Sequence, residues 1–228
     1  MRIKFNHIII LLLFIISFSS CGKEDAYVYP PVKLEYLTAE SGPNGSLQYV
    51  VTDDGERFDV SEDLSGTVIA SDSSIRIVSN YEILKDADAR GKKIKLYALL
   101  KTISPQPLPV SSFTEGLKTD PADVLSMWLG RDYLNITLSI KMHTEKHRFH
   151  FVEKSVDTDV TTGYKAVHLQ LYHDAGNDLE AFTRRAYLSV PLSKYVENNT
   201  EEIVVYFSVN TYDDGLKTYR FDYVPSSN

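Results

Sequence analysis

The sequence has very little cysteine and a deficit of basic residues. Cys21 is the single cysteine among 228 residues, which excludes internal disulfides and a cysteine-based zinc site. The folded part must therefore be stabilised by its core, and 43% hydrophobic residues suffice for one large core or two small ones. Acidic residues outnumber basic residues by 31 to 24, for a net charge of −7. We expect no nucleic-acid partner, because phosphate neutralisation requires lysine and arginine.

The sequence also lacks a long apolar run. The run Ile8–Phe18 has about 11 residues, whereas a membrane-spanning helix needs roughly 20. It follows a basic stub and precedes two serines, which is the order of a secretory signal. The sequence therefore predicts a signal peptide over residues 1–20 rather than an uncut transmembrane anchor.

Cys21 stands directly after the small residues, and this order resembles the lipobox of bacterial lipoproteins. We expect Cys21 to be lipidated, since two or more acyl chains give stable anchoring to a membrane. The alternative is a cleaved signal that leaves a free thiol, which is a liability in an oxidising compartment. Gly22–Asp25 resembles the export signal of Bacteroidetes surface lipoproteins, and residues 21–31 are typical of a tether. We expect an outer-membrane, cell-surface location, with a periplasm-facing placement as the alternative.

Residues 32–104 are predicted to form an OB-like barrel. The turn Asp53-Asp54-Gly55 separates two β-rich runs, which is a strong hairpin signal because Gly supplies the positive φ. Leu84–Arg90 is expected to form one helical turn. Five strands in about 70 residues fit a small closed barrel. The expected strands are Val32–Ala39, Leu47–Thr52, Glu56–Val60, Ile75–Ile83 and Lys92–Ile103.

Residues 112–228 are predicted to form an antiparallel β-sandwich. Three prolines within Ser104–Pro109 favour an extended linker, placed at residues 105–111. Asp120-Pro121 predicts a short helix from Pro121 to about Met127, because proline is common at the first helical position. Leu134–His143 alternates strictly between apolar and polar residues, which is typical of a half-buried strand. Further strands are expected at Arg148–Glu153, Ala166–His173, Ala186–Leu192, Ile203–Asn210 and Leu216–Val224, so the whole chain is predicted to be all-β.

Several short segments together resemble the NigD-like lipoproteins of Bacteroidetes. They are the lipobox, Thr52–Gly55, Asp132–Ile136 and Leu169–Asp178. The resemblance covers essentially the whole mature chain, and it implies an N-terminal OB-type barrel followed by a C-terminal β-sandwich. It implies no catalytic residues.

Two segments carry residues that bind metals in other proteins. His143, His147 and His150 lie within eight residues, but strand geometry points His150 away from His147, so a solvated hairpin is favoured over a zinc or copper site. The loop Asp174–Asp178 lacks the spacing of a calcium site, and its residues are those of an ordinary turn. We expect no metal and no cofactor.

Tyrosine is the one enriched residue type, with 15 copies. Tyr206 and Tyr212 have the opposite parity to the apolar residues of their strand, so they are predicted as possible ligand contacts. Nucleophilic catalysis has no recognisable motif, and no catalytic residue is assigned. The sequence favours a non-catalytic envelope lipoprotein that binds a protein or glycan ligand. The alternatives are an accessory component of an outer-membrane complex and a hydrolase of envelope or host polymers.

Overall fold

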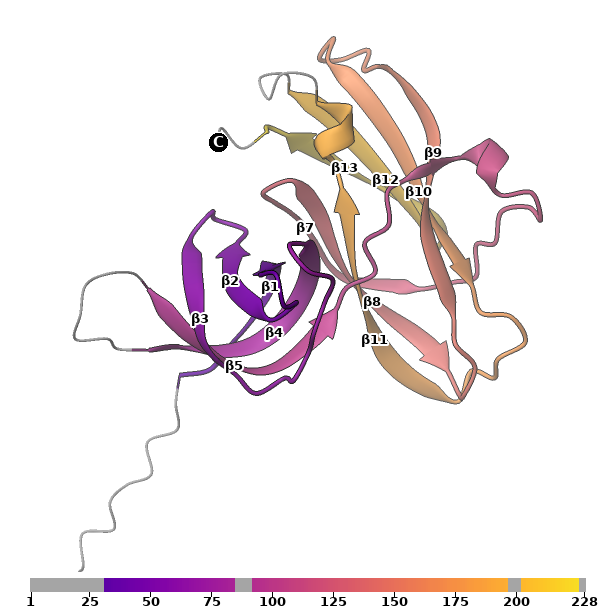
Figure 1. Cartoon of the computed structure of the whole chain (residues 1–228). Helices are drawn as coiled ribbons and strands as arrows, with labels where there is room; N and C mark the ends of the chain where they lie inside the picture. Colours follow the sequence, from indigo (N-terminus) through magenta and orange to yellow (C-terminus); the bar gives the residue numbers. More distant parts are fainter. Residues whose placement is uncertain (1–30, 85–91, 197–201, 226–228) are drawn as a thin grey trace, which may run out of the picture. The chain divides into compact units, whose positions relative to one another are not determined.

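The computed structural model describes residues 31–84, 92–196 and 202–225 (Figure 1). Every described strand lies in the unit Val32–Asn228. The predicted signal peptide, Cys21, most of the tether and the helical turn after Leu84 lie outside the described residues. Within the described ranges, no helix is long and apolar enough to cross a membrane.

The first five strands form a closed barrel in the order β1-β2-β3-β5-β4. The β3–β5 pair is parallel and the other pairs are antiparallel. Gly55, with φ of 83°, makes the turn of the β2–β3 hairpin, as its place after two aspartates predicts. The predicted OB-like barrel is confirmed. Its strands are β1 (Lys33–Ser41), β2 (Leu47–Thr52), β3 (Arg57–Asp63), β4 (Ser74–Leu84) and β5 (Lys93–Lys101).

Alternate residues of these strands fill the barrel. The interior residues recur with the period of two that a strand imposes, because successive side chains point to opposite faces. Each fully buried large apolar side chain contributes about 1.5–3 kcal/mol relative to an exposed one. The fully buried members are Leu37, Ala39, Val50, Phe58, Ile77, Tyr81, Ile94 and Leu96.

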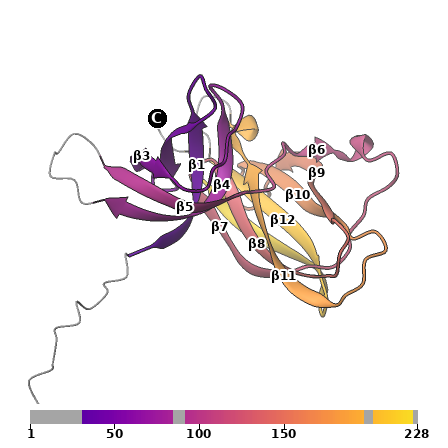
Figure 2. The same ribbon diagram turned by 60° about the horizontal axis from the view of Figure 1, so that its bottom comes forward.

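The remaining strands form two sheets, one of order β13-β12-β10-β9-β6 and one of order β11-β8-β7, packed as a sandwich (Figure 2). Both sheets contribute to one apolar core, in which Leu134, Ile136 and Leu138 of β8 meet Val205 and Phe207 of β12. The predicted sandwich is confirmed. Its elements are β6 (Leu108–Pro109), the 3₁₀ helix η1 (Val110–Ser112), β7 (Asp123–Gly130), β8 (Tyr133–Met142), β9 (Arg148–Thr158), β10 (Lys165–Asp174), β11 (Phe182–Pro191), the 3₁₀ helix η2 (Ser193–Tyr195), β12 (Ile203–Thr211) and β13 (Gly215–Tyr223).

The larger sheet differs from the purely antiparallel one that we expected. β10 pairs with β12 in parallel, and β6 pairs with β9 in parallel. The first of these pairs forms because β11 crosses to the other sheet between β10 and β12. The segment predicted as a linker, 105–111, contains β6, so part of it belongs to this sheet.

The predicted helix from Pro121 to Met127 is wrong, because this segment forms most of β7. Asp120 does not cap a helix. Its carboxylate accepts a hydrogen bond from the Ala175 N–H at 2.7 Å, and its carbonyl accepts one from the His173 ring at 2.9 Å. Ala122 then donates its N–H to the Asn210 carbonyl at 2.9 Å. These tertiary contacts hold the chain extended and outweigh the local helix signal.

Candidate functional site

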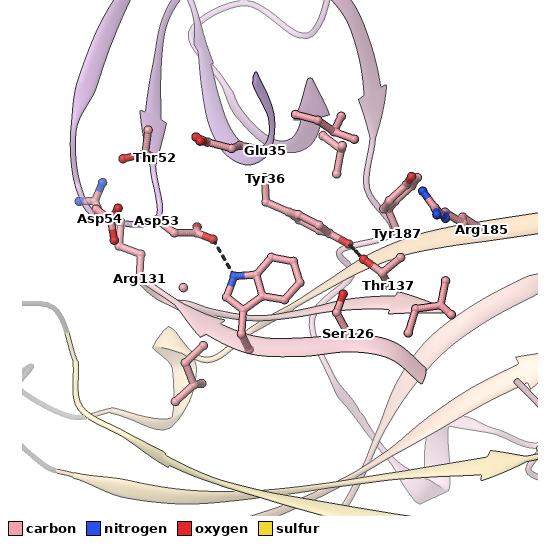
Figure 3. A pocket seen from close by; sticks show the side chains of 16 residues that line it. Glu35, Tyr36, Thr52, Asp53, Asp54, Ser126, Arg131, Thr137, Arg185 and Tyr187 are labelled. Carbon is pink, nitrogen blue, oxygen red and sulfur yellow. Dashed lines mark hydrogen bonds between the residues drawn. The ribbon is translucent and has the colours of Figure 1, made fainter. Parts of the chain in front are cut away.

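A cleft of about 600 Å³ lies between the barrel and the smaller sheet of the sandwich (Figure 3). Its barrel wall comes from the start of β1, the β2–β3 turn and one residue of β4. Its sandwich wall comes from β7, the β7–β8 turn, β8 and β11. The lining residues are Leu34, Glu35, Tyr36, Thr52, Asp53, Asp54, Val78, Leu125, Ser126, Trp128, Leu129, Gly130, Arg131, Thr137, Arg185 and Tyr187.

Aromatic rings from both walls meet at the floor of the cleft. The ring of Tyr36 on β1 lies edge-on to Trp128 on β7, with centroids 5.0 Å apart, and 6.1 Å from the ring of Tyr187 on β11. The Tyr36 hydroxyl donates a hydrogen bond to the Ile136 carbonyl at 2.7 Å. Burial raises the pKa of Tyr36 to about 12, so the hydroxyl keeps its proton and remains a donor.

A buried polar network joins the two walls beneath these rings. Arg76 of β4, whose side chain is 1% exposed, forms a salt bridge with Asp53 of the β2–β3 turn. Arg76 also donates to the Asn135 side-chain oxygen at 3.0 Å, and Asn135 donates to Asp53 at 2.8 Å. The Ser189 hydroxyl of β11 donates to the same Asn135 oxygen at 2.6 Å. Every charge in the network has a partner, as burial requires.

The β7–β8 hairpin brings its turn to Asp53. The indole N–H of Trp128 donates to Asp53 at 3.4 Å (Figure 3). Gly130 is required by this close approach, because a Cβ there would lie 2.2 Å from the Asp53 carboxylate. The next residue, Arg131, has φ of 52°, a left-handed conformation that costs a non-glycine residue about 1–2 kcal/mol. Such strain is typical of binding sites.

Arg131 and Arg185 line the cleft and, unlike Arg76, do not belong to the buried network. No hydrogen bond or ion pair joins Arg131 or Arg185 to any residue in the described part of the chain. Glu35 accepts a hydrogen bond from the Tyr81 hydroxyl at 2.7 Å and pairs with Lys33 at 3.5 Å. The cleft therefore presents two guanidinium groups that are available to a ligand, beside carboxylates that are mostly engaged.

The sequence-predicted contacts, Tyr206 and Tyr212, lie away from the cleft. Tyr206 stacks on His168 with centroids 4.7 Å apart, and its hydroxyl donates to Asp159. The Tyr212 hydroxyl accepts the Lys141 N–H at 2.8 Å. Both rings are half-buried, and the structure gives them different partners. A ligand contact at these tyrosines stays a prediction.

The three histidines singled out in the sequence do not converge. His143 stacks on Phe182, and His150 lies against Phe113. His147 is buried rather than solvated, and its Nδ1 forms a hydrogen bond with the His173 Nε2 at 2.9 Å. Among the described residues, no group of three or more His, Cys, Asp or Glu side chains has the geometry of a metal site.

The loop Asp174–Asp178 ties neighbouring loops together. The Asp178 carboxylate accepts backbone N–H groups of His143 at 2.6 Å, and of Thr144 and Glu145 at 3.2 Å each. Its other contact is the His147 Nε2 at 3.2 Å. Burial works to raise the pKa of Asp178, but these donors outweigh it and hold the pKa well below its usual range.

Sequence reasoning missed the residues that shape the cleft. Arg76 and Asn135 stand at polar positions of alternating strands, where solvent exposure is the ordinary interpretation. Asp53 was assigned to a turn, which is correct, but nothing local indicates its buried partner. The ring of Trp128 lines the cleft, although a tryptophan in a strand is as ordinary in a core. The single tryptophan, two residues before a glycine, is the one local signal that marks this site.

Comparison with known proteins identifies the family. Residues 106–223 match the model of the NigD-like C-terminal beta sandwich domain. A NigD-like immunity protein from Bacteroides caccae is 39% identical, with a TM-score of 0.72 over 88% of this chain and 100% of that chain.

Two more distant solved structures share the fold. A protein of unknown function from Bacteroides vulgatus is 22% identical, with a TM-score of 0.67 over 86% of this chain and 96% of that one. A candidate lipoprotein from Bacteroides fragilis is 13% identical, with a TM-score of 0.60 over 87% of this chain and 100% of that one. A search of curated proteins finds no match. By the family match and the 39% identity, the chain belongs to the NigD-like family.

Proposed function

We propose that this protein is a non-catalytic binding lipoprotein of the cell envelope, and that its ligand occupies the cleft between barrel and sandwich. Acyl chains on Cys21 hold it in the outer membrane, and the Lys-then-acidic segment after Cys21 favours the cell surface. The observation that carries the binding function is the cleft itself, because it combines aromatic floor residues with two guanidinium groups that pair with no described residue.

The chemistry of the lining supports binding over catalysis. The described lining residues of the cleft include no histidine or cysteine, so the aliphatic hydroxyls of Thr52, Ser126 and Thr137 have no imidazole among those residues to activate them. Aromatic rings and arginine side chains are the residue types that most often anchor protein partners. We expect the purified full-length protein in detergent to show no turnover of glycan, peptide or ester substrates. Turnover that is lost on Ser126→Ala would overturn the non-catalytic assignment.

Photo-crosslinking in intact cells tests the site. A benzoylphenylalanine residue placed at Leu125, on the cleft, is expected to capture a discrete ligand. The matched control places it at Val160, which is fully exposed and lies outside the cleft. Equal capture at both positions, or none at Leu125, would contradict a ligand in the cleft.

Immunity is a second proposal, carried by the 39% identity to the Bacteroides caccae protein of that name. In this case the ligand is a toxic polypeptide from a neighbouring cell. Deletion of the gene is then expected to sensitise the cell to medium conditioned by related strains, and re-expression is expected to restore resistance. Unchanged growth in all such media would contradict it.

A further inference from the structure

β7 is the open edge of its sheet. Within the described ranges, β7 pairs with β8 alone. The opposite edge, β11, is covered near its C-terminal end, where Ile103 donates its N–H to the Tyr187 carbonyl at 3.0 Å and accepts the Ser189 N–H at 3.0 Å. An uncovered edge presents N–H and C=O groups with which a further strand can pair.

The cleft reaches round this open edge. Trp128, Leu129 and Gly130 are consecutive, and all three line it. Trp128 packs on Tyr36 of the barrel whereas Leu129 packs against the sandwich core, so a cavity lined by both residues extends to the backbone of β7. Gly130 and Tyr133 flank a two-residue turn, which makes them a hydrogen-bonded pair. The backbone groups of Leu129 therefore point away from β8, as do those of Met127.

A second open edge faces the same cleft. β1 pairs with β4 from Lys33 onward, but with β2 only from Leu37. The residues before Leu37 that line the cleft, Leu34–Tyr36, are again consecutive. An extended chain in the cleft would thus lie between two strand edges. The register shift between Val124 and Ser126 limits regular pairing on β7 to about the five residues that follow it.

The side chains along these edges define what fits. Leu34 on the barrel wall is 57% exposed and Leu125 on the sandwich wall is 53% exposed, so each wall presents a largely exposed apolar side chain. Arg131 and Arg185 form no ion pair with a described residue, while Asp54 is the one lining carboxylate for which no partner is found in the described ranges. The available charge is therefore positive, in a chain whose net charge is −7.

We propose that the cleft binds an extended, acidic peptide segment of a partner protein, which adds to β7 as a fourth strand of the β11-β8-β7 sheet. Main-chain hydrogen bonds to β7 provide affinity, as in other cases of strand addition. Arg131 and Arg185 select acidic side chains, and the exposed leucines accept apolar ones. This inference rests on the proposed binding function and adds the chemical class of the ligand.

A display library of random ten-residue peptides, selected on the full-length protein, tests the ligand class. The enriched peptides are expected to be more acidic than the library and to lose about fivefold or more in affinity for Arg131→Glu and for Arg185→Glu. Val160→Glu, outside the cleft, is the matched control and is expected to retain full affinity. Enrichment of basic peptides, or of none that depends on the arginines, would overturn the proposal.

N-methylation of the backbone of one enriched peptide tests strand addition directly. Methyl groups at alternate residues are expected to lower the affinity by about tenfold or more, while those between them are tolerated, because only every second N–H of an added strand faces its partner. Uniform tolerance along the peptide would refute strand addition. The protein itself is unchanged in this series, so misfolding has no part in the result.

The two proposals can fail separately. If photo-crosslinking at Leu125 captures a glycan, or if the enriched peptides show no alternation, the cleft remains a binding site and only the strand-addition inference is overturned. If nothing is captured at Leu125 and no peptide depends on the arginines, the cleft is not a binding site and both are overturned.

Discussion

Removal of Arg76 is the sharpest perturbation that the structure offers. The variant Arg76→Met retains much of the side-chain length but deletes the charge that pairs with Asp53. Asp53 is 20% exposed, so its carboxylate would remain largely buried with only neutral donors, Asn135 and Trp128. Breaking a buried ion pair in this way costs about 3–5 kcal/mol. That is a large share of a total stability of about 5–15 kcal/mol.

The double variant Arg76→Met/Asp53→Asn tests whether the loss of stability comes from an unpaired buried charge. Asp53→Asn alone leaves the Arg76 guanidinium without its counter-ion, so each single variant should be strongly destabilised. In the double variant neither charge remains, and we expect it to be more stable than Arg76→Met alone, with a coupling energy of about 2 kcal/mol or more. The control is Arg57→Met, which removes an exposed pair with Asp59 at 3.4 Å and should cost less than about 1 kcal/mol.

Urea unfolding, followed by tryptophan fluorescence and by far-ultraviolet circular dichroism, measures these effects. Trp128 is the single tryptophan and donates to Asp53, so its fluorescence reports on this interface. For a slope near 2 kcal/mol per molar urea, a loss of 4 kcal/mol lowers the midpoint by about 2 M. If the two single losses add up in the double variant to within about 0.5 kcal/mol, the buried-pair reasoning is wrong.

Three further predictions concern a close contact in the cleft, a buried histidine and the cysteine that we expect to be lipidated. Gly130→Ala places a Cβ 2.2 Å from the Asp53 carboxylate and is expected to lower the urea midpoint well below that of Gly42→Ala, whose Cβ meets only the flexible end of Gln48; equal midpoints would contradict this. Burial lowers the pKa of His173 below its ordinary 6.5, so this side chain contributes stability above that value that is lost as the pH falls. The urea midpoint is therefore expected to fall from about pH 7 to about pH 5, and to fall less in His173→Gln; an equal decline in both would show that His173 is not the cause. Cys21→Ala is expected to abolish labelling by a palmitate analogue and to release the protein from membranes, and labelling that persists would place the lipid elsewhere.

The fold could be predicted because its signals are local. Strict alternation over Leu134–His143 marks β8, and Asp53-Asp54-Gly55 marks the β2–β3 hairpin, since each depends only on neighbouring residues. The helix expected from Pro121 is the exception. Asp120 has the composition of a helix cap, but its partners are Ala175 and His173, more than fifty residues away.

The cleft could not be predicted because its residues come from distant segments. Arg76 meets Asn135 across 59 positions, and Asn135 meets Asp53 across 82. A polar residue is ordinary at each of these positions, because Arg76 and Asn135 face away from the apolar cores on their strands and Asp53 lies in a turn. Only the packing of the barrel against the outer face of the smaller sheet buries them together, and no pattern within one strand encodes that contact.

The polar network between the barrel and the smaller sheet determines whether the cleft is formed before a ligand binds. Apolar surfaces pack in many orientations at similar cost, whereas a buried Arg76–Asp53–Asn135 network is satisfied in one arrangement and leaves unpaired charge in others. The network therefore fixes the distance between the β1 and β7 edges before any ligand arrives. A cleft that is already formed spares the ligand the cost of ordering its walls, so affinity depends mainly on the edge and side-chain contacts. Loosening the network with Arg76→Met should then weaken binding of the selected peptides even though Arg76 is not among the residues that line the cleft, and unchanged affinity in a folded Arg76→Met protein would show that the walls are set by other contacts.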